Sequence, residues 1–169
     1  HDRYEWSMLT DRKNVIWPEG KKLALWVNVC IQFFPINQKG KPFVPTGGLT
    51  MPYPDLRHYS LREYGNRIGI YRFLKCFDEY SIKPTFAMNT RVAERYPYLL
   101  DVIKERNEEI ICHGLHMDAI HYGGQDIDEE RQLVSRSLDI LRNLTGHDVT
   151  GWISPDRNES ENTPELLAE

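Results

Sequence analysis

The stretch that decides the fold is Glu109-Ile-Ile-Cys-His-Gly-Leu-His-Met-Asp118. Its apolar run, 110–112, predicts a short buried strand, and His113 follows at once. His116 and His121 come shortly after, so three of the six histidines in the chain follow one strand. Imidazole is a common metal ligand and changes charge near neutral pH. The sites of α/β proteins lie at the C-terminal ends of parallel strands. The cluster therefore predicts a functional site, whereas one histidine alone would fit an exposed loop.

Segments of strand and helix character alternate on both sides of this stretch. Strands are predicted at 22–34, 84–88, 110–112 and 149–153. In the first strand, Asn28, Cys30 and Gln32 share one face because successive side chains alternate. The order strand-helix repeated along the chain predicts an α/β fold with parallel strands and right-handed crossover helices. Such a series forms either a small open sheet or half of a barrel.

The helices are predicted from apolar spacing and from their end signals. Ile70, Phe73, Leu74 and Phe77 form one stripe at helical spacing, with Cys76 beside it as a small buried hydrophobe. Asn89 or Thr90 is expected to cap a short helix. Further helices are predicted at 98–106 and 128–145, the latter ended by Gly146, and a last one begins with Thr163 as N-cap before Pro164.

Composition excludes several classes of protein. The 169 residues carry a formal net charge of −4, which argues against nucleic-acid binding. No apolar run is long enough for a membrane helix. The three cysteines show no CxxC pairing and suit a reducing compartment, so a cytoplasmic protein is expected. Residues 1–22 are predicted as a polar arm and 23–169 as one domain.

A long connection follows the first strand. It is predicted to run from Pro35 to about Arg62 and is rich in proline and glycine. Long loops of this kind are usually lids or binding loops. Tyr53, His58 and Tyr59 either face a substrate or pin the loop to the body, and the sequence leaves both open.

Five motifs together resemble the polysaccharide deacetylase (NodB-homology, carbohydrate esterase family 4) superfamily. They are Gly65-Asn-Arg-Ile-Gly-Ile-Tyr-Arg72, Lys83-Pro-Thr-Phe-Ala87, Glu109-Ile-Ile-Cys-His-Gly114, Gly151-Trp-Ile-Ser-Pro-Asp-Arg157 and Thr163-Pro-Glu-Leu-Leu167. The chain looks closest to the branch of cofactor-independent allantoinases and cyclic imide hydrolases. The resemblance implies the N-terminal part of a distorted (β/α) barrel that hydrolyses amide C–N bonds.

The chain departs from the metal-dependent members of that family. The first histidine of their His-x-x-x-His pair matches His113, but the second position is Met117, with His116 one place early. Where their aspartate pair belongs, this chain has Val29-Cys-Ile-Gln32. Two explanations stay open: a metal-free protein, or a zinc site in which the Cys30 thiolate joins His113 with His116 or His121.

Each candidate site residue has a functional and a structural interpretation. His113 is predicted as the base that activates water, or else as a strand-end histidine bonded to backbone. Arg157 is predicted by the resemblance to grip substrate or orient a carboxylate. Asp118 either orients a histidine or binds a metal, or else it caps a turn. Further substrate-binding candidates are Asn28 and Cys30 on the pocket floor, His116 and Asn158. Trp152 either forms a wall against a planar substrate ring or belongs to the core.

Three functions follow from these residues. The first is hydrolysis of a small cyclic amide, ureide or imide without a metal. The second is metal-dependent N-deacetylation of an amine or polysaccharide. The third is a non-catalytic member or one subunit of a split enzyme, because the strand-one acids are missing. The later strands of the family domain do not occur in this sequence, which fits either a fragment or one polypeptide of a site that a homo-oligomer or a second chain completes.

Overall fold

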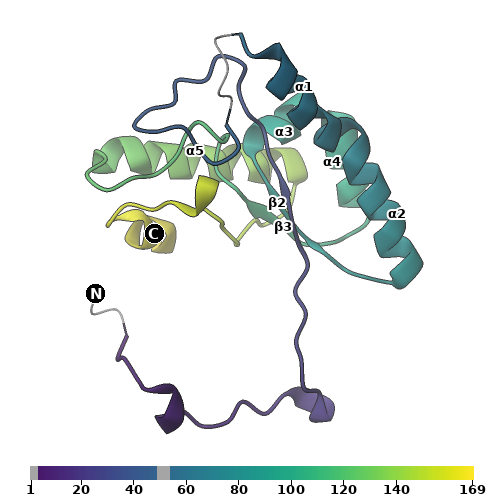
Figure 1. The fold of residues 1–169 in the computed structure, drawn as a ribbon, viewed down its shortest axis with the longest axis vertical. Helices are drawn as coiled ribbons and strands as arrows, with labels where there is room; N and C mark the ends of the chain where they lie inside the picture. Colours follow the sequence, from purple (N-terminus) through teal and green to yellow (C-terminus); the bar gives the residue numbers. More distant parts are fainter. Residues whose placement is uncertain (1–3, 49–53) are drawn as a thin grey trace.

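Three parallel strands form the centre of the molecule. The computed structural model describes residues 4–48 and 54–169, and Figure 1 shows their arrangement. β1 (Asn28–Ile31), β2 (Thr85–Met88) and β3 (Ile110–Cys112) lie in the order β1-β2-β3. Both pairings are parallel, with Cys30 opposite Ala87 and Met88 opposite Cys112. The predicted α/β fold with crossover helices is confirmed, and the described strands form an open sheet, as expected of part of a barrel.

Two of the predicted strands are shorter than expected. Only four residues of 22–34 form the strand, because β2 is itself four residues long. Val27, just before the strand, adds one bond, its carbonyl oxygen accepting from Thr85 N at 2.9 Å. The predicted strand 149–153 is reduced to one parallel bridge between Trp152 and Cys112. Its backbone bonds are Cys112 N to Gly151 O, 2.9 Å, and Ile153 N to Cys112 O, 2.9 Å. This bridge still brings the segment beside β3 and in the same direction.

Helices cover the sheet and begin near the predicted positions, with one exception. Their bounds are α1 Leu56–Tyr64, α2 Ile70–Tyr80, α3 Thr90–Arg95, α4 Pro97–Glu105, α5 Ile127–Thr145 and α6 Thr163–Ala168. The exception is α1, because the long connection was expected to run to about Arg62. A π-helical segment, Gly65–Gly69, joins α1 to α2 without a break.

The start of α1 explains the shorter loop. Asp55 is its N-cap and accepts a bond from His58 N at 3.1 Å, while His58 Nδ1 lies 2.7 Å from Asp55 Oδ2. Tyr59 OH accepts a bond from Arg95 Nη2 at 3.1 Å. Tyr59 therefore pins the end of the loop to α3, whereas His58 bonds the cap of its own helix, and Tyr53 lies outside the described residues.

The stripe on α2 is narrower than predicted. Ile70, Leu74 and Phe77 are buried, but Phe73 is 55% exposed and stacks on Phe77 at a centroid distance of 5.9 Å. Cys76 is exposed, so its prediction as a buried residue is wrong. Its place on the solvent side of α2 follows from the 100° turn between successive helical residues. The largest fully buried apolar side chains are Phe86, Met88, Leu99, Ile103, Met117 and Leu141.

The ends of α5 and α6 differ in how well the sequence predicted them. Gly146 follows α5 with φ of 70° and donates to Arg142 O at 2.8 Å, as expected of a C-terminal cap. Thr163, predicted as the N-cap of α6, is instead its first residue. Ser160 Oγ accepts the bonds from Asn162 N and Thr163 N, at 2.8 and 3.2 Å. The capping oxygen therefore comes from Ser160.

The residues before β1 run apart from the body (Figure 1). From position 4 to position 26 all of them are exposed, including Trp6, Ile16 and Leu25. No helix among the described residues is long and apolar enough to cross a membrane.

Candidate functional site

A pocket of about 320 Å³ opens at the C-terminal ends of β1 and β3. Its polar lining includes Asn28, Cys30, Gln32, His113, Asp156 and Arg157. The first three lie on one face of the first strand segment, as the alternation predicted. The last two come from the 3₁₀ turn Pro155–Arg157 that follows the Trp152 bridge. The site is therefore built from the first strand, the third strand and the fourth segment.

His113 is the buried histidine of this pocket, with 2% of its surface exposed. Its Nδ1 lies 2.7 Å from Ile153 O, and its Nε2 lies 3.1 Å from Gln32 Nε2. Burial lowers the pKa of His113, and the positive charge of Arg157 acts in the same direction. His113 is thus neutral near pH 7, and both ring nitrogens have partners.

Two residues after β2 fix the backbone around His113. Asn89, fully buried, accepts from Phe33 N at 2.8 Å and donates from its amide to His113 O. Thr90 Oγ1 donates to Gly114 O at 3.0 Å. The sequence predicted these residues as helix caps, but the Asn89 side chain makes no capping bond. The sequence carries one signal that could identify Asn89 as a site residue. It is an amide side chain directly after a buried strand, and the ends of the strands meet at the site.

Arg157 offers a free positive charge to the pocket. Its side chain is exposed, and it makes no ion pair within residues 4–48 and 54–169. Burial raises the pKa of the Cys30 thiol, and the nearby Arg157 charge opposes this. A guanidinium without a carboxylate partner is suited to bind a substrate carboxylate or carbonyl.

Asn28 leaves an acceptor unpaired at the pocket. Its Nδ2 contacts Cys30 Sγ at 3.8 Å. Its Oδ1 is buried and has no hydrogen-bond partner among the described residues. A buried amide oxygen without a donor is costly, so an N–H group of a bound molecule would stabilise it.

Asn158 and Trp152 support the site from outside the pocket. Asn158 Nδ2 donates to Asp156 Oδ2 at 3.2 Å and so braces the turn that carries Arg157. Trp152 packs against the hydrophobic core, and its Nε1 donates to Ser154 Oγ at 2.9 Å. Neither residue lines the pocket, so the core interpretation of Trp152 fits the geometry.

His116 and Asp118 lie in a second pocket, of about 420 Å³. The Asp118 carboxylate accepts from Lys39 N at 2.6 Å and Gly40 N at 2.9 Å. His116 Nδ1 accepts from Asp118 N at 3.2 Å. Burial lowers the pKa of His116 to about 4. Asp118 therefore fastens the long loop, and the two residues stand apart from the His113 pocket.

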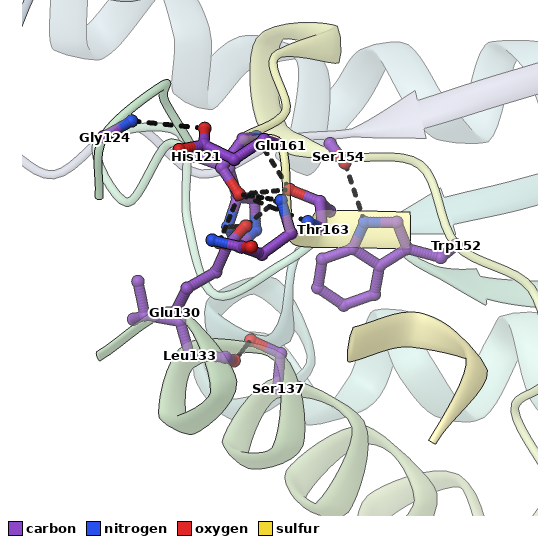
Figure 2. Close-up of polar contacts among 11 residues, drawn as sticks. His121, Gly124, Glu130, Leu133, Ser137, Trp152, Ser154, Glu161 and Thr163 are labelled. Atoms are coloured by element: carbon purple, nitrogen blue, oxygen red, sulfur yellow. Dashed lines mark hydrogen bonds and ion pairs between the residues drawn. The ribbon is translucent and has the colours of Figure 1, made fainter. Parts of the chain in front are cut away.

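His121 belongs to a buried polar network (Figure 2). Its Nδ1 lies 3.0 Å from the Glu130 carboxylate of α5, and neither side chain is more than 1% exposed. Glu130 also accepts bonds from Ser160 Oγ and Thr163 Oγ1. The network ties α5 to the start of α6 and does not reach the His113 pocket.

These positions do not fit a zinc site. Of the proposed ligands Cys30, His113 and His116, only the first two line one pocket. Across residues 4–48 and 54–169, no three His, Cys, Asp or Glu residues form a group that could hold a metal ion. The Nε2 atom of His113, which a zinc ion would need, faces the Gln32 amide.

Comparisons with known proteins bear on the family and the fold. A family model described as polysaccharide deacetylase matches residues 64–169. The chain is 27% identical over 105 residues to the peptidoglycan deacetylase of Helicobacter pylori, covering 62% of this chain and 35% of that protein. A solved structure from Mycobacterium smegmatis, assigned to the polysaccharide deacetylases, is 26% identical with a TM-score of 0.72, covering 91% of this chain and 50% of that chain.

A second solved structure is that of an allantoinase. PuuE allantoinase is 26% identical with a TM-score of 0.70, and the match covers 89% of this chain and 52% of that chain. The chain thus spans about half the length of these solved relatives and about a third of the curated one.

Proposed function

Because this chain belongs to the polysaccharide deacetylase family, we propose that it carries part of the site of a hydrolase for amide C–N bonds other than peptide bonds. The substrate class we propose is a small cyclic amide, ureide or imide. The observation that carries the proposal is that one pocket holds a neutral buried His113 and Arg157, which makes no ion pair with the described residues. The structural likeness to PuuE allantoinase supports this substrate class.

The pocket complements both sides of an amide. The Asn28 Oδ1 atom needs a donor, which a substrate N–H provides. The Arg157 guanidinium needs an acceptor, which a carbonyl oxygen or a carboxylate provides. A cyclic ureide or imide presents N–H and C=O groups side by side, so one small ring can satisfy both residues.

His113 supplies the acid–base chemistry in this proposal. Its Nε2 accepts a proton from water while the water oxygen attacks the carbonyl carbon. The tetrahedral oxyanion then forms within reach of the Arg157 charge, which stabilises it. The C–N bond breaks as the proton passes from Nε2 to the leaving nitrogen. His113 returns to its neutral form, the ring opens to a carboxylic acid and an amine or amide nitrogen, and the acid then loses its proton to the solvent.

The rest of the site is proposed to come from outside the described strands. The outer edge of β1 has no paired strand among the described residues. Unpaired edges are normally covered in native proteins. A second copy or another polypeptide that pairs with β1 would close the barrel over the pocket.

The test is hydrolysis of hydantoin, allantoin and a cyclic imide, measured as acid release at pH 7. We expect turnover that falls about 10²- to 10⁴-fold in His113→Gln. The matched control is His147→Gln, which changes an exposed histidine beyond α5 and leaves turnover unchanged. An acetylated glucosamine oligomer serves as contrast substrate, because the Helicobacter pylori relative is named a peptidoglycan deacetylase. Cleavage of that oligomer alone would overturn the cyclic substrate class, and undiminished turnover in His113→Gln would overturn the role of His113.

A further inference from the structure

Gln32 is the polar residue closest to the reactive nitrogen of His113 in the pocket. It follows β1 directly and is half-buried. Its side-chain Nε2 lies 3.1 Å from His113 Nε2. Its backbone oxygen accepts a bond from Asn66 Nδ2 at 2.9 Å, so the backbone at Gln32 is fixed from the α1–α2 side.

The protonation of His113 follows from its other neighbour. Ile153 O, 2.7 Å from His113 Nδ1, is a carbonyl and accepts hydrogen bonds only. Nδ1 therefore carries the ring proton. Because burial keeps the ring neutral, Nε2 holds a lone pair. The group that faces this lone pair is then the NH₂ of Gln32, which donates to it, and not the Gln32 oxygen.

We propose that Gln32 is a positioning residue. Its side-chain NH₂ donates a hydrogen bond to the Nε2 lone pair of His113 until a substrate oxygen accepts a bond from the same NH₂ instead. This inference rests on the proposed function, in which His113 Nε2 deprotonates water. A substrate carbonyl oxygen that enters the same pocket is a second acceptor for this NH₂ group, beside His113 Nε2. Substrate binding then frees Nε2 when water must be activated. The same contact keeps Nε2 from coordinating a metal ion.

The charges around His113 are few. Asp156 and Arg157 act on it from the Pro155–Arg157 turn, and Cys30 lines the same pocket from β1. Gln32 adds no charge. A carboxylate at position 32 would therefore be the one new charge in contact with Nε2, which makes substitutions at this position informative.

The first experiment is ¹⁵N NMR of the histidine rings in the full chain. We expect His113 to show the tautomer with Nδ1 protonated and Nε2 bare at pH 7. In Gln32→Glu we expect the titration midpoint of His113 to rise by about one pH unit or more, since a carboxylate favours the imidazolium. The control is Gln132→Glu on the exposed side of α5, which leaves that midpoint unchanged. A ring protonated at Nε2, or an unmoved midpoint in Gln32→Glu, would overturn the proposal.

A second variant removes the hydrogen bond from Gln32 to His113 Nε2 without adding a charge. Gln32→Leu removes the NH₂ group but keeps an apolar side chain of similar size. Diethyl pyrocarbonate reacts with unprotonated ring nitrogens, so we expect it to modify His113 several-fold faster in Gln32→Leu than in Gln132→Leu. Equal rates in the two variants would contradict the role of Gln32. Both experiments report on His113 without turnover, so they separate this inference from failure of the proposed hydrolysis.

Discussion

Two consecutive residues beside the pocket adopt left-handed backbone. Asp156 has φ of 56° and Arg157 has φ of 58°, which is costly for residues other than glycine. The Asp156 carboxylate accepts from Thr46 N at 3.1 Å and from Asn158 Nδ2 at 3.2 Å. These bonds hold the turn, and the turn brings Arg157 to the pocket. Strain of this kind gathers at functional sites, where it fixes a side chain that regular structure would direct elsewhere.

The turn also needs Gly114. This residue has φ of 69°, and a Cβ there would lie 2.5 Å from Pro155 Cγ. We expect Gly114→Ala to lower the free energy of unfolding by about 2–4 kcal/mol, because it adds backbone strain and a clash. We also expect it to weaken any hydrolysis, since Pro155 must move and carries Arg157 with it. Urea unfolding measures the first effect, and the cyclic amide assay the second.

A matched glycine separates the two causes. Gly124 has φ of 79° and nothing within 4 Å of an added Cβ. Gly124→Ala therefore carries the backbone strain alone, about 1 kcal/mol. Equal losses of stability in the two variants would contradict a role for the contact between Gly114 and Pro155.

Single residues were predictable where a local signal marks them. His113 and Asn28 follow from strand position and alternation, and both line the pocket. The roles of Gln32 and Asn89 were not predictable, because each bonds a partner far along the chain, His113 in both cases. His116 shares the signal of His113 but turns to a different pocket. In a loop, a shift of one residue along the sequence is enough to point a side chain in another direction. The regular spacing of side chains in helices and strands does not apply there.

At the scale of elements, the long connection after β1 is held by two carboxylates. Asp118 binds the backbone amides of Lys39 and Gly40, and Asp156 binds Thr46. One carboxylate belongs to the segment after β3 and the other to the turn after the Trp152 bridge. The loop is thus fastened to the same two segments that carry His113 and Arg157, so its position is coupled to the site.

We expect Asp118→Ala to release the first of these attachments. The amides of Lys39 and Gly40 lose their acceptors, and the loop opens more often. Trypsin cleaves after lysine, so cleavage between Lys39 and Gly40 should accelerate about ten-fold, while the bond before Pro42 stays resistant. Limited proteolysis with mass detection gives the rate.

The control for this prediction is an exposed aspartate for which the described part of the chain shows no such bonds. Asp139 lies exposed on α5, and Asp139→Ala should leave the cleavage rate after Lys39 unchanged. Cleavage after Lys39 that is equally slow in Asp118→Ala would mean that Asp118 does not hold the loop.

Element types were largely predictable, and element lengths were not. The apolar runs and helical stripes gave β2, β3, α4 and α5 close to their observed bounds. Strand length depends on a neighbour, however, and the 22–34 run pairs over β1 only, because β2 is short. α1 was missed because its mostly polar sequence has no apolar stripe, and its stability comes from the Asp55 cap and from tertiary contacts.

At the scale of the whole molecule, folding buries several histidines in their neutral form. Burial lowers the pKa of His113, of His121 and of His116, the last to about 4. In the unfolded chain each titrates near 6.5. Between the folded and unfolded values, the unfolded state binds more protons than the folded state. The free energy of unfolding therefore falls as pH drops below about 6.5.

The last prediction follows from that sign. Each fully shifted histidine contributes up to about 1.4 kcal/mol per pH unit, so stability should decline steeply between pH 6.5 and pH 5. It should be nearly flat from pH 7 to pH 8, where all three rings are neutral in both states. Urea unfolding at half-unit intervals measures the slope. His116→Gln should reduce the slope of the unfolding free energy against pH by about the contribution of one histidine. His147→Gln, at an exposed position, should leave that slope unchanged. Because ordinary carboxyl groups titrate mainly below pH 5, a flat profile from pH 6.5 to pH 5 would mean that the three rings titrate in the folded protein as they do in the unfolded chain.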